Sequence, residues 1–381
     1  MNLESLSLFL MWIKQLSALN FKNYTEFTIN FSEGVNAFSG DNGAGKTNLL
    51  DALHYLALCK SFFNPVDSQQ IKNGTDFFML QGVFQKNEDE DVISCSLKKN
   101  QKKQFKRNKK EYTRLADHIG LYPLVMISPN DSIIITDGSE ERRRFMDNVI
   151  SQTDSSYLDL LIAYNRILQN RNGLLKQARH GYMDPDLLSI YNDQLAVPGN
   201  KIYACRKAFM QLFNELFNTH YAFITDGAEP VTLSYESQLN NYDFNSLLNE
   251  SADRDRQLER TTTGIHKDDL IFTVNGMPLK KFGSQGQQKS FLIALKLAQY
   301  SYLIEKKGYK PLLLLDDIFD KLDDKRIKRL MEMVSKEEFG QIFITHTNAE
   351  KVRDVFKNIP CDLRTFEVIR GEIEEIRSSN E

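Results

Sequence analysis

The residues at 40–47 have the types and spacing that bind a chain of phosphates. They read GDNGAGKT and fit the pattern G-x-x-x-x-G-K-S/T. An apolar run at 35–38 precedes them and a helical apolar pattern begins at Leu49, which is the strand-loop-helix context that the motif requires. Backbone N–H groups of such a loop, together with the N-terminus of the next helix, surround phosphate oxygens. We therefore expect a nucleoside triphosphate at Gly40, Asp41, Asn42, Gly43, Ala44, Gly45, Lys46, Thr47 and Asn48.

Within this loop the pattern assigns Lys46 to the β and γ phosphates and Thr47 to Mg²⁺. Two carboxylates follow a second apolar run, the four leucines at 312–315, which is typical of a parallel strand buried on both faces. Ligands bind at the C-terminal ends of such strands. We expect Asp316 to hold Mg²⁺ and Asp317 to orient or deprotonate the attacking water. The plain alternative is a pair of aspartates that only cap a strand end.

A third motif, SQGQQ at 284–288, is weak alone, because small and amide residues are common at helix starts and Ser284 is a good N-cap. It gains weight from its position, since it opens a helical pattern shortly before the strand that ends in Asp316.

The composition, 41% hydrophobic and 26% charged over 381 residues, is that of a globular protein with two or three domains. No apolar run is long enough to span a membrane. The first residues have neither a basic start nor a cleavage site, so we expect no signal peptide, and Met11 begins the regular pattern. Four scattered cysteines and six histidines without ligand spacing indicate reduced thiols, a cytoplasmic location and no zinc site. The net charge of -3 means that any DNA contact must come from a local patch.

The pattern along the chain predicts an α/β domain that is split by a helical insertion. Strands are expected within 12–30, 35–39, 77–84, 92–97, 98–110 and 124–128, with a helix at 48–57. Helices follow at 139–149, 155–177 and 187–219, with a break at 180–185, an interruption near Pro198 and Gly199, and a polar connection at 240–260. The last third predicts a hairpin at 269–280, helices at 284–305 and 323–334, strands at 311–316 and 341–345, and a hairpin at 363–376. We therefore expect an ATP-binding domain at 11–130 and 261–381 and a helical domain at 131–260.

The ordered motifs resemble those of ABC-type ATPase heads and, among these, the RecF family of DNA repair proteins. The resemblance covers the chain from about Met11 onward and includes LNFKNYTEFTINF, KSF, ISPND, ERRRFMD, NDQLAVPG and GIHKDD besides the three motifs above. It implies an SMC-like ATPase head, a mixed sheet flanked by helices, without the long coiled coil. It also implies a homodimer that closes with ATP on DNA at gaps or single-strand/double-strand junctions. Such a protein would support RecA loading with RecR and RecO partners in recombinational repair, replication restart and the SOS response.

The resemblance assigns roles to further residues. Ser284, Gly286 and Gln287 would contact the γ-phosphate held by the other subunit, and residues 320–323, including Asp323, would form the loop at the dimer seam. His346 would sense the γ-phosphate and join Lys46 and Asp317 as a catalytic residue. Most fast relatives carry glutamate where Asp317 stands, and the shorter side chain predicts a weak, DNA-stimulated ATPase that acts as a switch. No clear Q-loop glutamine is present, and Asn130 or Asp131 takes its place in our interpretation. Phe63 replaces an arginine that relatives often carry.

The residues between 98 and 110 include eight basic ones. A charge run is usually a solvated face, but in a DNA-binding head it could contact phosphates, and such contacts depend strongly on salt. The candidates are Lys98, Lys99, Lys102, Lys103, Lys106, Arg107, Lys109 and Lys110, with Arg142, Arg143, Arg144, Lys280 and Lys281 as secondary ones.

Three other functions remain as alternatives. An SMC-like ATPase that partners a nuclease would share all three motifs. A nucleotide-binding subunit of an ABC transporter usually lacks a helical insertion of this length, and nothing in the sequence suggests a membrane partner. A small-molecule kinase with a phosphate-binding loop has no reason to carry SQGQQ.

Overall fold

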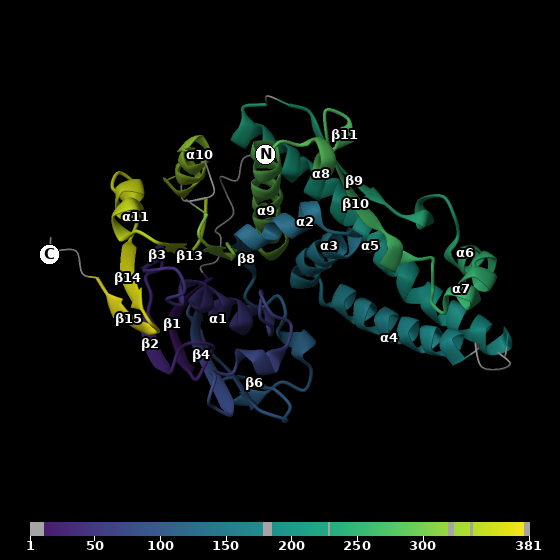
Figure 1. The fold of residues 1–381 in the computed structure, drawn as a ribbon, viewed down its shortest axis with the longest axis horizontal. Helices are drawn as coiled ribbons and strands as arrows, with labels where there is room; N and C mark the ends of the chain where they lie inside the picture. The colour runs from purple at the N-terminus through teal and green to yellow at the C-terminus, as the bar shows by residue number, and fades with distance from the viewer. Residues whose placement is uncertain (1–10, 178–184, 228, 319–323, 336–337, 377–381) are drawn as a thin grey trace. The chain divides into compact units, whose positions relative to one another are not determined.

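The structure is a computed structural model that describes residues 11–177, 185–227, 229–318, 324–335 and 338–376 (Figure 1). The chain forms two compact units, one built from residues up to 131 and from 293 onward, the other from 132–292. The helical unit ends at residue 292, and not at residue 260 as the sequence predicts. Residues 261–292 belong with the helical unit because the strand at Asp269–Val274 pairs with the strand at Val231–Glu236. In the described part of the chain, no helix has the length and apolar character that crossing a bilayer requires.

The first unit contains two sheets. An antiparallel sheet has the strand order β2-β1-β4-β5-β6-β7, and a mixed sheet has the order β15-β14-β3-β13-β12-β8. The strands are β1 (Met11–Leu19), β2 (Glu26–Asn30), β3 (Val35–Ser39), β4 (Phe77–Lys86), β5 (Asp89–Lys98), β6 (Gln104–Arg107), β7 (Lys110–Glu111), β8 (Leu124–Ile127), β12 (Leu312–Leu315), β13 (Ile342–His346), β14 (Leu363–Ile369) and β15 (Glu372–Glu375).

The burial pattern explains why these segments are strands. The β4 strand alternates between exposed and buried side chains, as expected for a sheet with one solvated face. The strands β3, β12 and β13 are buried at every position, as expected for parallel strands in the middle of a sheet. Helix α1 (Lys46–Leu58) packs between the two sheets, and its apolar residues belong to one core with Phe38, Phe78 and Phe343. Helices α10 (Asp324–Ser335) and α11 (Ala349–Phe356) also lie in this unit.

The second unit is mainly helical, and α9 (Gln285–Lys307) begins in it and continues into the first unit. A small antiparallel sheet, β11-β10-β9, lies against the helices. The elements are α2 (Ile133–Thr136), α3 (Ser139–Thr153), α4 (Ser155–Gln177), α5 (Pro185–Thr225), β9 (Val231–Glu236), α6 (Phe244–Glu250), α7 (Ala252–Leu258), β10 (Asp269–Val274), β11 (Met277–Pro278) and α8 (Leu279–Phe282).

Helix α5 differs from the sequence-based expectation of an interruption near Pro198. It runs unbroken through this proline for 41 residues. Proline removes one hydrogen bond from a helix interior, but Leu195 and Ile202 on either side are fully buried and hold the helix in place. Gly199 is explained by packing, because a Cβ atom there would lie 2.3 Å from the Phe244 ring. The expected break at 180–185 falls mostly on 178–184, outside the described residues.

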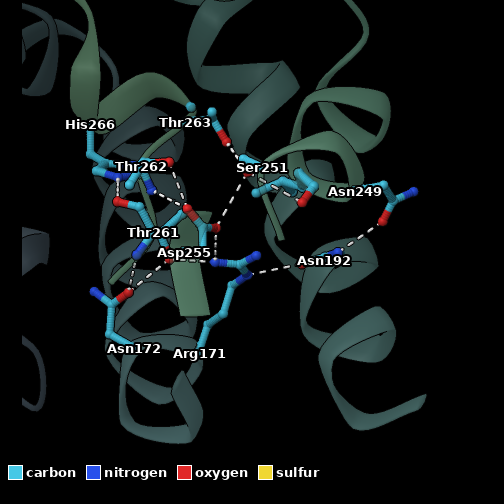
Figure 2. A network of polar contacts seen from close by, with 12 residues as sticks. Arg171, Asn172, Asn192, Asn249, Ser251, Asp255, Thr261, Thr262, Thr263 and His266 are labelled. Atoms are coloured by element: carbon cyan, nitrogen blue, oxygen red, sulfur yellow. Dashed lines mark hydrogen bonds and ion pairs between the residues drawn. The ribbon is translucent and has the colours of Figure 1, made fainter. Parts of the chain in front are cut away.

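The polar run at 240–260 is not a plain connection, because it contains α6 and α7. Several of its polar side chains, among them those of Asn249, Ser251 and Asp255, take part in a network of polar contacts inside the unit (Figure 2). Arg171 and Asp255 form an ion pair of 2.7 Å in which both side chains are fully buried. Arg171 also donates to Asn192 and to Thr261. A buried ion pair of this kind is stable only when its other donors and acceptors also find partners. The surrounding amide and hydroxyl groups supply most of them, while Arg171 Nη2 has no hydrogen-bond partner among the described residues.

Candidate functional site

The loop at 40–45 connects β3 to α1 in the strand-loop-helix order that the sequence predicts. Lys46 is only 3% exposed. Its ammonium group donates to the backbone oxygens of Gly40, at 2.8 Å, and Asp41, at 3.0 Å. Gly40 has φ 145°, and a Cβ atom there would lie 2.2 Å from the Val368 carbonyl oxygen. Only glycine fits this position, and the loop wraps around the ammonium group as a phosphate-binding loop does.

A pocket opens beside this loop, lined by residues 39–44, by residues 367–370 and by Thr347 and Ala349. The loop residues therefore border open space on the side that faces the end of β14. Thr47 and Asn48 follow at the N-terminus of α1, where the helix dipole favours negative charge.

The candidate metal site brings together residues that are far apart in the sequence. Thr47 Oγ1 donates to Asp316 Oδ1 at 2.8 Å, and Thr345 Oγ1 donates to the same oxygen at 2.9 Å. Ser128 Oγ lies 3.5 Å from Asp316 Oδ2. The parallel pairing of β12 with β8 and β13 places these three strand ends side by side. Burial raises the pKa of the Asp316 carboxyl above its usual value, while the hydroxyl donors act in the opposite direction.

Asp317 has a different environment from Asp316. Its backbone adopts φ 45°, a left-handed conformation that aspartate tolerates better than most residues. Its N–H group donates to Thr345 Oγ1 at 2.9 Å, which fixes the turn. Among the described residues nothing hydrogen-bonds to its buried Oδ1 atom. A buried carboxylate oxygen left without a protein donor suits a hydrated cation or an attacking water, so this donor set fits Mg²⁺ and its water.

His346 ends β13, next to the strand that carries the phosphate-binding loop. It is 2% exposed, and its Nδ1 atom accepts the N–H group of Asn348 at 2.8 Å. This bond fixes the tautomer with the proton on Nε2. The structure thus places His346 at the same edge of the mixed sheet as Lys46 and Asp317.

The SQGQQ motif starts α9 and lies in the second unit. Ser284 and Gln287 form a reciprocal cap: the Ser284 N–H group donates to Gln287 Oε1 at 2.6 Å, and the Gln287 N–H group donates to Ser284 Oγ at 3.2 Å. The Gln287 amide also donates to Glu229. Gly286 lies in this first turn, and Ser284 is exposed. The expected seam loop at 320–323, with Asp323, lies outside the described residues.

The segment proposed as a Q-loop has a structural role at Asp131. This residue is buried, pairs with Lys296 at 2.6 Å and accepts the Ser128 N–H group at 2.8 Å. Burial raises the pKa of Asp131, and Lys296 opposes that effect. Asn130 is exposed. Ser128 approaches Asp316, and sequence reasoning missed it; a hydroxyl directly after the apolar strand β8 was the available signal.

The basic run at 98–110 does not form one patch, because β6 separates it into two turns. Lys98, Lys99 and Lys102 lie at one end of β6 and Lys109 and Lys110 at the other, and all five are exposed. Lys106 lies between them on β6 and is half-buried.

Two members of the run stabilise the fold, which the sequence pattern did not indicate. Lys103 pairs with Asp67 at 2.8 Å and also donates to the Cys59 carbonyl oxygen. Arg107 makes two bonds of 2.8 Å to the Asp91 carboxylate. These partners already satisfy the charge of both side chains.

The secondary basic candidates also include both residues with partners inside the unit and exposed lysines. Arg142 makes a two-point ion pair with Asp269, and Arg143 donates to the Asp268 carbonyl oxygen. Arg144 pairs with glutamates on its own helix and is partly exposed. The remaining two candidates, Lys280 and Lys281, are exposed on α8.

The mixed parallel sheet, the glycine-rich loop and the acidic strand end define a P-loop ATPase head of the ABC type. Residues 12–364 match the model of the family described as RecF/RecN/SMC N terminal domain. The chain is 51% identical, over 93% of its length and 99% of the relative, to the DNA replication and repair protein RecF of Flavobacterium johnsoniae. It is 46% identical, over 96% of its length and 99% of the relative, to the protein of the same name from Bacteroides fragilis. The chain belongs to the RecF family.

Solved structures agree with this assignment. A structure described as the recombination mediator protein RecF with ATP in the RecFOR pathway has a TM-score of 0.87 and 29% identity, covering 99% of this chain and all of that one. The Smc head domain from Pyrococcus furiosus has a TM-score of 0.57 at 17% identity, covering 96% of each chain, and shows that the head fold is shared. The family and the head fold expected from the sequence are confirmed.

Proposed function

We propose that this chain is an ATP-dependent switch that acts on DNA in replication and recombinational repair. The geometry around Lys46 carries the proposal: a buried ammonium group inside a glycine-rich loop, with Thr47 and two carboxylates beside it. The relatives named DNA replication and repair protein RecF and the structure described as RecF with ATP support the substrate and the pathway. The protein would act in the cytoplasm.

In this proposal Gly40, Asp41, Asn42, Gly43, Ala44, Gly45, Lys46, Thr47 and Asn48 hold ATP. Thr47 and Asp316 would hold Mg²⁺, which supplies charge neutralisation of the phosphates when bound. Asp317 orients or deprotonates the attacking water, and His346 contacts the γ-phosphate. Asp317 has a shorter side chain than a glutamate and a left-handed backbone, so its carboxylate reaches the attacking water less easily. We therefore expect slow hydrolysis.

The second half of the site would come from another copy of the chain. Ser284 is exposed at the N-terminus of α9 and the cap formed with Gln287 fixes this first turn. A helix N-terminus of this kind attracts phosphate. Ser284, Gly286 and Gln287 of one subunit would then cover the triphosphate held by the other, so that ATP closes a homodimer and hydrolysis opens it.

DNA would be held through phosphate contacts at gaps or single-strand/double-strand junctions. The exposed lysines of the two turns, Lys98, Lys99 and Lys102 on one side and Lys109 and Lys110 on the other, are the proposed contacts. The proposed contacts leave out Lys103 and Arg107, which pair with Asp67 and Asp91, and Lys106, which is half-buried on β6. RecR-like, RecO-like and RecA-like proteins are the proposed partners, in keeping with the RecFOR pathway of the solved relative.

The test is retention of gapped duplex DNA with and without ATP by wild type and by Lys46→Ala. The wild type should retain DNA more strongly with ATP, and retention should fall steeply as salt rises. The variant should lose at least about 100-fold in ATP affinity, because a charge-assisted phosphate contact in a partly buried site is removed. Unchanged ATP-dependent retention by the variant would refute the proposal.

A further inference from the structure

The turn between β1 and β2 holds the phosphate-binding loop from behind, although it lies 21 residues away in the sequence. The Asn23 amide donates to the Ala44 carbonyl oxygen at 2.9 Å, and the Tyr24 hydroxyl donates to the Gly45 carbonyl oxygen at 2.9 Å. Asn48, at the start of α1, donates to the Asn23 side-chain oxygen at 2.7 Å. The turn therefore contacts the loop at two successive carbonyl groups and at the helix that follows.

These contacts determine where the loop N–H groups point. In a trans peptide the N–H bond lies opposite to the C=O bond of the preceding residue. Holding the Ala44 and Gly45 carbonyl groups against the turn therefore directs the N–H groups of Gly45 and Lys46 away from it. Two other loop carbonyl groups, those of Gly40 and Asp41, are held by the Lys46 ammonium group.

The turn is rigid enough to hold the loop in this way. Tyr24 is fully buried and packs edge-on against Phe27, with ring centroids 4.8 Å apart. Lys72 donates to the Asn23 carbonyl oxygen at 2.9 Å and to the Thr25 hydroxyl at 2.7 Å. Space is also limited, because a Cβ atom on Gly45 would lie 2.5 Å from the Asn23 amide and 2.6 Å from the Tyr24 hydroxyl.

We propose that Asn23 and Tyr24 are positioning residues of the nucleotide site, which keep the N–H groups of Gly45 and Lys46 directed at the phosphates. This inference rests on the proposed function, since it requires that a triphosphate bind the loop. Neither side chain touches the nucleotide, and both act through the carbonyl groups that they hold. The loop is thereby preorganised, so that less ordering accompanies binding.

The experiment compares Tyr24→Phe with Tyr309→Phe, a matched control. Tyr309 is also buried in the first unit, and its hydroxyl donates to a backbone carbonyl, that of Leu121, at 3.2 Å. Tyr24→Phe should weaken binding of a fluorescent ATP analogue by roughly three- to tenfold, the effect of one hydrogen bond. Competition by inorganic triphosphate should weaken by the same factor, because the effect falls on the phosphates. Tyr309→Phe should leave both affinities unchanged.

A second variant, Asn23→Ala, removes both the donor to Ala44 and the acceptor of the Asn48 amide, and should weaken both affinities by at least a similar factor. Urea unfolding of all the variants measures their stability separately, and folded protein is used throughout. Wild-type affinity in Tyr24→Phe and Asn23→Ala, or an equal loss of affinity in Tyr309→Phe, would overturn the inference. A wild type that binds neither ATP nor inorganic triphosphate would instead overturn the proposed function.

Discussion

Asp316 and Asp317 are adjacent in the sequence but have different surroundings. Asp316 accepts hydroxyl groups from two other strand ends and the phosphate-binding loop, while the buried oxygen of Asp317 has no donor among the described residues. The parallel sheet brings Thr47, Ser128 and Thr345 to Asp316, whereas the left-handed turn directs Asp317 elsewhere. The two carboxylates therefore suit different tasks, one as a cation ligand and the other as a partner for water.

At the residue scale, Asp317→Asn should separate hydrolysis from binding. The substitution keeps the shape and removes the charge that attracts a proton, so turnover should fall by at least about 100-fold. ATP affinity should change little, and the ATP-bound form should persist. Release of phosphate and nucleotide binding are measured on the same preparation, with Asp354→Asn, at an exposed position of α11, as the control. Turnover equal to that of the control would remove Asp317 from the mechanism.

At the scale of elements, short motifs and periodic patterns predicted most of the fold. The loop at 40–47 and the leucines at 312–315 identified β3, α1 and β12, because motif and burial pattern agree there. The pattern failed where partners distant in the sequence decide the structure. Gly199 looks like a helix breaker but fits against Phe244. The polar run at 240–260 contains two helices, because α6 buries Phe244, Leu247 and Leu248 and α7 supplies Asp255 to the buried Arg171.

In the candidate site, too, local motifs predicted some residues, while others depend on partners that are distant in the sequence. Lys46, Thr47, Asp316 and Asp317 could be proposed from local motifs, and the structure brings Thr47 and Asp316 into contact. Asn23, Tyr24 and Ser128 could not be assigned, because nothing local indicates which distant backbone or carboxylate they meet. Charge counting likewise could not distinguish Lys103 and Arg107, which have acidic partners, from the exposed lysines around them.

The helical unit offers a test of the packing at Gly199. In Gly199→Ala the new Cβ atom would collide with the Phe244 ring, and we expect a loss of about 1–3 kcal/mol in the free energy of unfolding. Gly173→Ala, in α4, is the matched control, because nothing lies within 4 Å of its added Cβ atom. That variant should gain up to about 1 kcal/mol from helix propensity. Urea unfolding measures both, and equal effects in the two variants would contradict the packing argument.

For the whole molecule, buried histidines set a pH dependence of stability. Burial lowers the pKa of His54, His118, His220 and His266 to about 4. Because the unfolded chain binds protons near pH 6.5 and the folded chain does not, these residues make the protein less stable as pH falls from 6.5 toward 4. Each contributes a loss of about 1 kcal/mol by pH 5.5. The raised pKa of Asp131, Asp268 and Asp316 acts in the opposite direction at pH values above 3.8.

NMR of the histidine ring resonances separates the contribution of the histidines from that of the aspartates, because only the imidazole groups give these signals. We expect the four rings to remain neutral at pH 5.5, and urea unfolding at pH 7.5 and 5.5 should show the lower midpoint at the acidic value. Titration of these rings near pH 6.5 in the folded protein would contradict the assignment of burial as the cause.

The most direct measurement for the whole account is sedimentation velocity of the wild-type chain without nucleotide, with ADP and with ATP, each with and without gapped duplex DNA. If each copy supplies half of the site, a dimer should form with ATP and be absent with ADP. The fraction of the chain in the dimer should increase further when DNA is added. A chain that is saturated with ATP and still sediments as a monomer at every concentration, with or without DNA, would contradict the shared site.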